Sequence, residues 1–388
     1  MAKVDAGSAV NERRRVLEGK IAGETAPSGD TIVPKGGMYI PSLDGIRAIS
    51  FFLVFFAHAG LGSVLVPGGF GVTIFFLLSG FLITTLLRLE YLRFKRISLK
   101  DFYLRRALRI LPPLYVTLAL SMLLVILGKV ATGIPLWGTL SQALQYANYY
   151  QIYAENPVSM PGTGVFWSLA VEEHFYLLFP LFYVWMSPRL TRTHQALVLS
   201  MLCAAALAWR CVLFFHFHSS FDRIYLATDT RFDSILLGCV LATAASPVLR
   251  DPLHELLVSQ MRWLVPVSLA LLIATFLYRS EWFRNTFRYT IQGVALMPLL
   301  IAAVRFQGSL VVRILNLPWV RFLGVLSYSL YLCHSIILEA IIRVWAIGPV
   351  FTGAAGIVSA LIFATLVHYL VERPCTKARK RLSRVQPN

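Results

Sequence analysis

Long apolar runs are the feature of this sequence that most restricts its fold. Runs of about 17–25 residues, enough to cross a bilayer as helices, lie near residues 43–61, 68–88, 112–129, 165–186, 195–216, 231–247, 262–279, 288–305, 321–342 and 349–371. With 57% hydrophobic and 14% charged residues, the chain is not an ordinary soluble globule. The sequence predicts an all-α polytopic membrane protein, a bundle of about ten transmembrane helices.

The basic residues predict how these helices are oriented. Lys and Arg cluster before the first run and at 88–109, 188–192 and 377–384, whereas 130–164 contains neither. Basic connections stay in the cytoplasm, so both termini are expected there. The basic connection at 278–288 falls outside in this scheme and disagrees with it. The net charge of +17 therefore indicates membrane topology and not nucleic-acid binding.

Three segments are expected along the chain: a flexible basic cytoplasmic tail at 1–37, a membrane domain at 38–375 and a second basic cytoplasmic tail at 376–388. The first tail lacks the apolar core of a signal peptide. The five cysteines show no CxxC spacing, and no His/Cys pattern indicates a metal site. We therefore expect neither a disulfide framework nor a bound metal.

Ionisable residues inside the apolar runs are the candidate functional residues, because each costs at least about 2.5–3.5 kcal/mol on insertion scales. Arg47 and His58 are eleven residues apart in the first run. On a helix this spacing places both side chains on one face, roughly 16 Å apart along the axis. Arg47 then lies toward the cytoplasm and His58 in the outer half of the membrane.

Other ionisable residues are expected at the depth of His58. Glu172 and Glu173 follow about two turns below the outer surface on a run of opposite direction. His334, Asp229 and Arg231 also fall in the outer half. For these last three, a network that only holds helices together is the alternative to a functional role.

The pairing of histidine with glutamate indicates a type of chemistry. A histidine whose developing charge is stabilised by a carboxylate is a general base, and His58 with Glu173 or Glu172 is the predicted pair. Such a base suits deprotonation of a hydroxyl for acyl transfer, directly or through an acyl-histidine. A proton-coupled transporter or flippase uses the same residue types. It would also need broken helices in matching halves, and no convincing pair is visible.

Six ordered segments resemble the acyltransferase-3 family of integral-membrane O-acyltransferases. They are LDGIRAISFFLVFFAHAG, GGFGVTIFFLLSGFLITTLL, FYLRRALRILPPLY, FWSLAVEEHFYLLFP, TDTRFDSILLGCVLA and SYSLYLCHSIILEAIIR, within about residues 41 to 375. The resemblance implies transfer of an acyl group, commonly acetyl from acetyl-CoA, to a hydroxyl of a carbohydrate or other small acceptor. It also implies a location in the bacterial cytoplasmic (inner) membrane.

The resemblance also assigns residues to roles. The family's Arg-x10-His motif falls on Arg47 and His58, preceded by an acidic residue at Asp44. In the family reading Arg47 contacts the acyl-CoA donor or pairs with Asp44. The motif residues expected to bind CoA phosphates are Arg105, Arg106 and Arg109. The residues expected on the acceptor side are Trp167, Ser168, Asp229, Arg231 and His334.

The outer-half position of His58 favours a lipid-linked or exported glycan acceptor, although some family members modify small cytoplasmic-facing molecules. Other members carry an extracytoplasmic esterase-like domain that we do not find in this sequence. The protein is therefore expected to act alone or with a separate extracytoplasmic acyltransferase partner.

Overall fold

The computed structural model describes residues 39–61, 67–130, 134–249, 251–345 and 348–382. All regular secondary structure within these ranges is helical. The predicted tail at 1–37 lies outside the described residues. The described part of the second tail belongs to a helix, α18 (Arg373–Leu382).

Each of the ten predicted apolar runs overlaps a long helix. These helices are α2 (Pro41–His58), α3 (Gly69–Phe94), α4 (Leu99–Ile126), α7 (Trp167–Met186), α8 (Arg192–Phe215), α10 (Thr228–Ala244), α12 (Met261–Leu277), α14 (Arg288–Arg305), α16 (Pro318–Trp345) and α17 (Pro349–Val367). Proline opens α2, α16 and α17, where its fixed φ angle and missing N–H are tolerated.

Six of the segments are long and apolar enough to cross a membrane on their own: Gly69–Phe94, Leu99–Ile126, Gly164–Met186, Arg192–Phe215, Pro318–Trp345 and Pro349–Ala378. The bent pair α11 (Pro252–Ser259) and α12, whose axes differ by 81°, gives a seventh candidate. The described chain therefore has the helices of a multi-pass membrane protein, while ten crossings stay a prediction.

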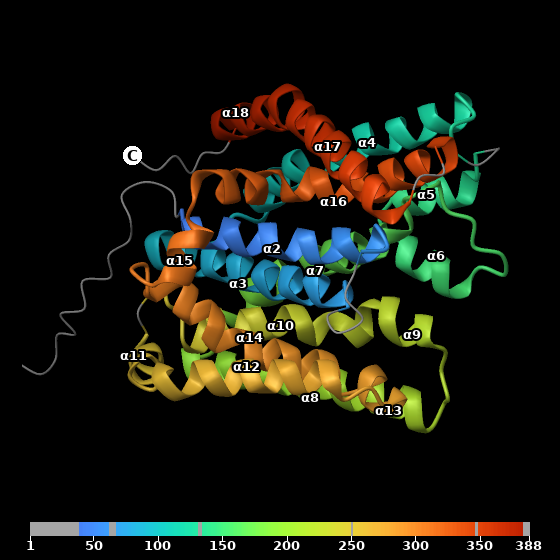
Figure 1. Ribbon diagram of the computed structural model, residues 1–388. Helices are drawn as coiled ribbons and strands as arrows, with labels where there is room; N and C mark the ends of the chain where they lie inside the picture. The colour runs from blue at the N-terminus through green and yellow to red at the C-terminus, as the bar shows by residue number, and fades with distance from the viewer. Residues whose placement is uncertain (1–38, 62–66, 131–133, 250, 346–347, 383–388) are drawn as a thin grey trace, which may run out of the picture. The chain divides into compact units, whose positions relative to one another are not determined.

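Short helices lie at the two ends of the bundle (Figure 1). At one end are α11, α15 (Leu310–Leu315) and α18. At the other are α5 (Leu136–Ala143), α6 (Ala147–Tyr153), α9 (Phe221–Leu226) and α13 (Glu281–Asn285). We call these the α18 end and the α9 end. Two further short turns, η1 (Gly164–Phe166) and the π-helical η2 (His368–Glu372), precede α7 and α18.

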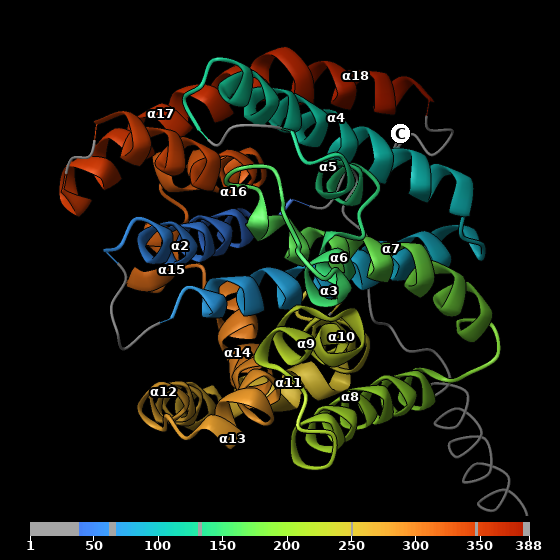
Figure 2. The ribbon, with the colours of Figure 1, turned by 90° about the vertical axis from the view of Figure 1, so that its right-hand side faces the viewer.

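Helix α3 is internal and α8 is peripheral, as Figure 2 shows. In the most apolar part of α3, 83% of the residues are buried, and in that of α8 only 22% are. Helix α3 packs against α2, α7, α10 and α14. The apolar side chains that α8 leaves exposed match a lipid environment. The long helix that follows His58 in the chain is therefore an internal one.

Glycines set the closest helix approaches. A Cβ atom on Gly238 of α10 would lie 2.6 Å from the backbone nitrogen of Phe81 on α3. A Cβ atom on Gly324 of α16 would collide with the backbone of Asp44 on α2. Small residues let helix backbones touch in this way. The close approach in each pair, α3 with α10 and α2 with α16, therefore fixes the position of one helix along the other.

We predict that Gly238→Ala destabilises the fold by about 1–3 kcal/mol, the usual cost of overpacking. Thermal unfolding of the purified protein in detergent measures this effect. The control is Gly308→Ala, since a Cβ atom there meets nothing within 4 Å. Equal unfolding temperatures for the two variants would contradict the close packing of α3 on α10.

Candidate active site

Two histidines from α2 and α16 meet near the α9 end. The Nε2 atom of His334 lies 3.4 Å from the Nδ1 atom of His58, and the ring centroids are 5.1 Å apart. His334 is fully buried, whereas His58 is exposed and lines a pocket. One ring of the pair is thus accessible to a substrate and the other is not.

The carbonyl groups around the pair determine where the protons lie on the neutral rings. His334 Nδ1 is 2.7 Å from the carbonyl oxygen of Tyr331 and 3.2 Å from that of Leu330. His58 Nδ1 is 2.9 Å from the carbonyl oxygen of Val54. Carbonyl oxygens only accept hydrogen bonds, so both Nδ1 atoms carry the proton. The Nε2 atom of His58 then holds the lone pair of a base, and that of His334 is an acceptor facing His58.

The pocket beside His58 has a volume of about 570 Å³. Among the side chains that line it are His58, Gln151, Trp167, Phe221, Asp222 and Tyr225. They come from α2, α6, α7 and α9, and Figure 2 looks onto the α9 end of the bundle, where α6 and α9 lie. The volume falls in the range of about 300–1,000 Å³ that is typical of small-molecule sites.

The two predicted glutamates lie among arginines. Glu172 accepts a hydrogen bond of 3.0 Å from the Tyr176 hydroxyl, which also bonds to Ser79. The Arg106 guanidinium lies 4.0 Å from the Tyr176 ring centroid and interacts electrostatically with both glutamates, and Arg47 does so with Glu172. Glu172 and Glu173 therefore belong to a charged cluster with Arg106.

The predicted pairing of His58 with Glu172 or Glu173 is not among the contacts found for the described residues. The contacts found for His58 are with Val54 and His334. The ionisable side chain found beside His58 is that of His334.

The three arginines expected to bind the donor have different surroundings. Arg105 pairs with Glu90 at 3.1 Å, so its charge is engaged in the α3–α4 connection. Arg106 stacks on Tyr176, and Arg109 is exposed. Arg109 is thus the most accessible member of the motif.

Arg47, the fourth residue expected near the donor, lies 3.4 Å from Asp44. This is one of the two contacts expected for Arg47. Both residues lie on α2, one turn apart, where oppositely charged side chains three positions apart can meet.

Asp229 takes part in contacts that hold helices together. Its carboxylate accepts hydrogen bonds from Arg223, at 2.5 Å and 3.0 Å, and from the Trp209 indole at 2.7 Å. These contacts tie α9 and α8 to the start of α10. Asp229 therefore fixes the position of α9.

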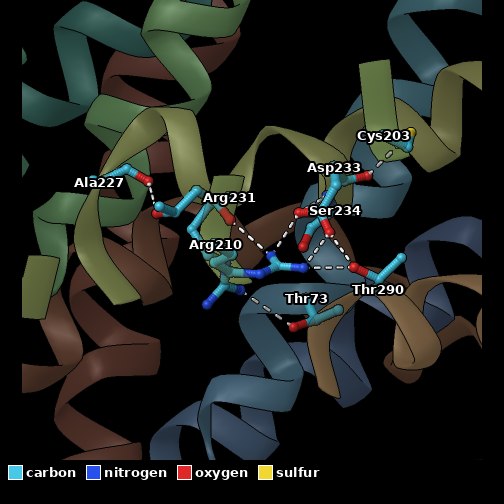
Figure 3. Close-up of polar contacts among 9 residues, drawn as sticks. Thr73, Cys203, Arg210, Ala227, Arg231, Asp233, Ser234 and Thr290 are labelled. Atoms are coloured by element: carbon cyan, nitrogen blue, oxygen red, sulfur yellow. Dashed lines mark hydrogen bonds and ion pairs between the residues drawn. The ribbon is translucent and has the colours of Figure 1, made fainter. Parts of the chain in front are cut away.

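Arg231 is fully buried behind the pocket. Its guanidinium lies 4.0 Å from the Tyr289 ring centroid, 5.2 Å from that of Tyr225 and 5.8 Å from that of Trp167. One long hydrogen bond of 3.4 Å reaches Thr73 (Figure 3). Arg231 therefore supports two of the rings that line the pocket.

A neighbouring buried ion pair completes this region. Arg210 donates to both carboxylate oxygens of Asp233, at 3.0 Å and 2.8 Å, and to the Thr290 hydroxyl at 2.6 Å (Figure 3). Both charged side chains are fully buried. Removing one partner of such a pair typically costs about 3–5 kcal/mol, so the pair fastens α8 to α10.

Ser168 and Trp167 begin α7 at the pocket. The Ser168 hydroxyl lies 2.6 Å from the Tyr331 hydroxyl, which itself donates to the Val165 carbonyl oxygen at 3.1 Å. Tyr331 is also the residue whose carbonyl holds the His334 ring. Ser168 thus connects the start of α7 to the histidine pair through one side chain.

Several residues of the site were missed by the sequence analysis. Tyr176 follows Glu172 by four residues on one helix, a spacing that places both on one face and signals the contact. Phe221, Asp222 and Tyr225 lie in a connection between apolar runs. No periodicity links that connection to His58, so only the fold brings them together.

In the residues that the structure describes, no group of three or more His, Cys, Asp or Glu side chains is arranged to hold a metal ion.

Comparison with known proteins identifies the family to which the chain belongs. The acyltransferase domain family Acyl_transf_3 matches residues 40–372. O-acetyltransferase OatA of Staphylococcus aureus strain NCTC 8325 / PS 47 is 29% identical over 359 residues, covering 87% of this chain and 57% of that protein. Putative O-acetyltransferase SACOL0978 of Staphylococcus aureus strain COL is 30% identical over 352 residues, covering 87% and 58%. The chain thus spans little more than half the length of these relatives. No solved structure matches it.

Proposed function

Because the chain belongs to the Acyl_transf_3 family of acyltransferases, we propose that it is a membrane O-acyltransferase that moves an acetyl group from acetyl-CoA to a hydroxyl of a glycan acceptor. The observation that carries this proposal is the His58–His334 pair, whose exposed member lines a pocket at the α9 end. The two relatives named as O-acetyltransferases support the acetyl group as the group transferred.

We further propose that all ten long helices of the described chain cross the bacterial cytoplasmic membrane, with both termini in the cytoplasm. Successive long helices alternate in direction between the two ends of the bundle, which supports this number of crossings (Figure 1). Basic residues at the α18 end, including Lys95, Arg96, Arg189 and Lys377, support a cytoplasmic position for that end. The α9 end, with the pocket, then faces outward.

In the proposed reaction His58 acts as the general base. Its Nε2 atom takes the proton of the acceptor hydroxyl as the oxygen attacks the thioester carbonyl carbon. The new C–O bond forms, the C–S bond breaks, and the CoA thiolate leaves with the electron pair. The proton on His58 then passes to the thiolate, which restores the base.

His334 is the positioning residue for His58. Its Nδ1–H is held by two carbonyl groups, so its Nε2 lone pair faces the Nδ1–H of His58. When His58 gains a proton, this acceptor stabilises the cation and keeps the ring in place. The role is that of the carboxylate in other catalytic dyads, filled here by a neutral group.

The donor approaches from the α18 end. Arg109 and Arg106 bind the CoA phosphates in this proposal, and Arg47 lies on the path toward His58, with Asp44 as its partner. Glu172 and Glu173 hold Arg106 by charge. The pantetheine arm of the donor then spans the roughly 16 Å along α2 that separate Arg47 from His58, so that the thioester reaches His58.

We predict that His58→Ala lowers acetyl transfer at least 10²-fold, because general-base catalysis typically contributes about 10²–10⁴-fold. The assay measures CoA release from acetyl-CoA by the protein in proteoliposomes, with isolated cell-envelope glycan as acceptor. The matched control is His216→Ala, since His216 is exposed just after α8. Turnover retained in a folded His58→Ala protein would disprove the role of the base.

We predict that His334→Leu lowers kcat about tenfold or more without changing the KM for acetyl-CoA, because His58 loses its second Nδ1–H acceptor and keeps only the Val54 carbonyl oxygen. His334→Gln keeps an acceptor oxygen and should restore part of kcat. A purely structural role would give equal kcat losses in both variants at equal thermal stability.

We predict that Arg109→Ala raises the KM for acetyl-CoA about tenfold, the equivalent of one charge-assisted hydrogen bond of about 1.4 kcal/mol. Arg93→Ala removes the same charge at the same end of the bundle and is the control. Equal KM values in the two variants would remove Arg109 from the donor site.

A further inference from the structure

One wall of the pocket consists of three aromatic rings that contact one another in sequence. Trp167, Tyr225 and Phe221 all line the pocket. The Trp167 and Tyr225 centroids are 4.8 Å apart, and Phe221 and Tyr225 stack at 5.1 Å with 16° between their planes. Phe221 is 47% exposed. The wall therefore runs from the start of α7 to an accessible ring at the start of α9.

This wall is supported from behind. The buried guanidinium of Arg231 lies within 6 Å of the Tyr225 and Trp167 centroids, and the Tyr289 ring lies 6.0 Å from Tyr225. The ion pair of Arg223 with Asp229 fastens α9 to α10. The rings are thus held in place before any ligand arrives, which reduces the entropy that binding must overcome.

Polar groups lie beside the aromatic wall. Asp222 and Gln151 both line the pocket, and Asp222 is exposed. The Gln151 Nε2 atom donates one hydrogen bond to the Gly164 carbonyl oxygen at 3.1 Å, which leaves its second N–H and its oxygen for a ligand. The neighbouring Arg223 directs its charge to Asp229. A carboxylate accepts hydrogen bonds from hydroxyl groups, and an amide both donates and accepts them. The pocket thus offers a flat apolar face next to groups that recognise hydroxyls.

A pyranose ring has the complementary surface. One face of such a ring presents C–H bonds that pack on an aromatic ring, and its edge carries hydroxyl groups. A simple alkyl alcohol would use only the wall, and the carboxylate of Asp222 repels an anionic ring. An uncharged sugar therefore matches both parts of the pocket.

We infer that the exposed ring of Phe221, with Tyr225 stacked behind it, forms a stacking subsite for an uncharged pyranose ring of the acceptor, and that Asp222 and Gln151 select its hydroxyl groups. The subsite holds one sugar hydroxyl at His58, which lines the same pocket. This inference rests on the proposed function and adds the residues that determine which acceptor is used.

Binding measurements on the full chain in lipid nanodiscs test the subsite. The probes are the uncharged tetrasaccharides maltotetraose and tetra-N-acetylchitotetraose and the anionic tetragalacturonate. We expect at least one uncharged probe to bind, Phe221→Ala and Asp222→Ala each to weaken that binding about tenfold, and the affinity for acetyl-CoA to stay unchanged. Phe217→Ala is the matched control, because Phe217 is an exposed ring in the same connection that packs against Trp209.

The outcomes separate the subsite from the enzyme activity, since CoA release is measured independently on the same preparations. Failure of the wild-type protein to bind either uncharged probe, tighter binding of tetragalacturonate, or equal binding by the Phe221→Ala and Phe217→Ala variants would overturn the subsite. Saccharide binding that depends on Phe221 in a protein that releases no CoA would support the subsite and disprove the proposed function.

Discussion

The interior of a bilayer supplies no hydrogen-bond partners, so every ionisable side chain placed there must find its partner within the bundle. Most of the charged groups described above satisfy this condition in pairs, such as Arg210 with Asp233 and Arg223 with Asp229. These pairs fasten helices together. His58 differs, because its ring has a protein partner on one nitrogen and lies against a pocket. His58 is thus the histidine of the pair that the bundle leaves accessible from the pocket.

The polar groups divide into two zones along the bundle. Arginines and glutamates gather around Arg106, and histidines and aromatic rings gather at the α9 end. A highly charged donor and an uncharged sugar would need such different surroundings. Helix α2 links the zones, since it carries both Arg47 and His58. The proposed reaction therefore has its two substrates meeting along one helix from opposite sides.

Sequence periodicity predicted the parts of this structure that are local. Hydrophobic run length located the long helices, and helical geometry placed Arg47 and His58 on one helix. Which side chains meet across two helices could not be predicted from the sequence, because it depends on helix rotation and on close approaches such as that of Gly324 to Asp44. His334 was therefore predicted at the right depth without being identified as the neighbour of His58. The α9 residues could not be predicted at all, since irregular connections carry no periodic signal.

The contact of Gly324 with Asp44 has a mechanical consequence. It sets the register of α16 on α2 ten residues before His334 on α16 and fourteen before His58 on α2, roughly 15 Å and 21 Å along the helices. A slip of one residue would move His334 by about 1.5 Å and turn it by about 100°. If His58 is the base, as proposed, its surroundings at the pocket thus depend on how tightly α2 and α16 pack toward the other end of the bundle. Because bilayer thickness acts on helix tilt, the proposed reaction would then respond to the surrounding lipid independently of both substrates.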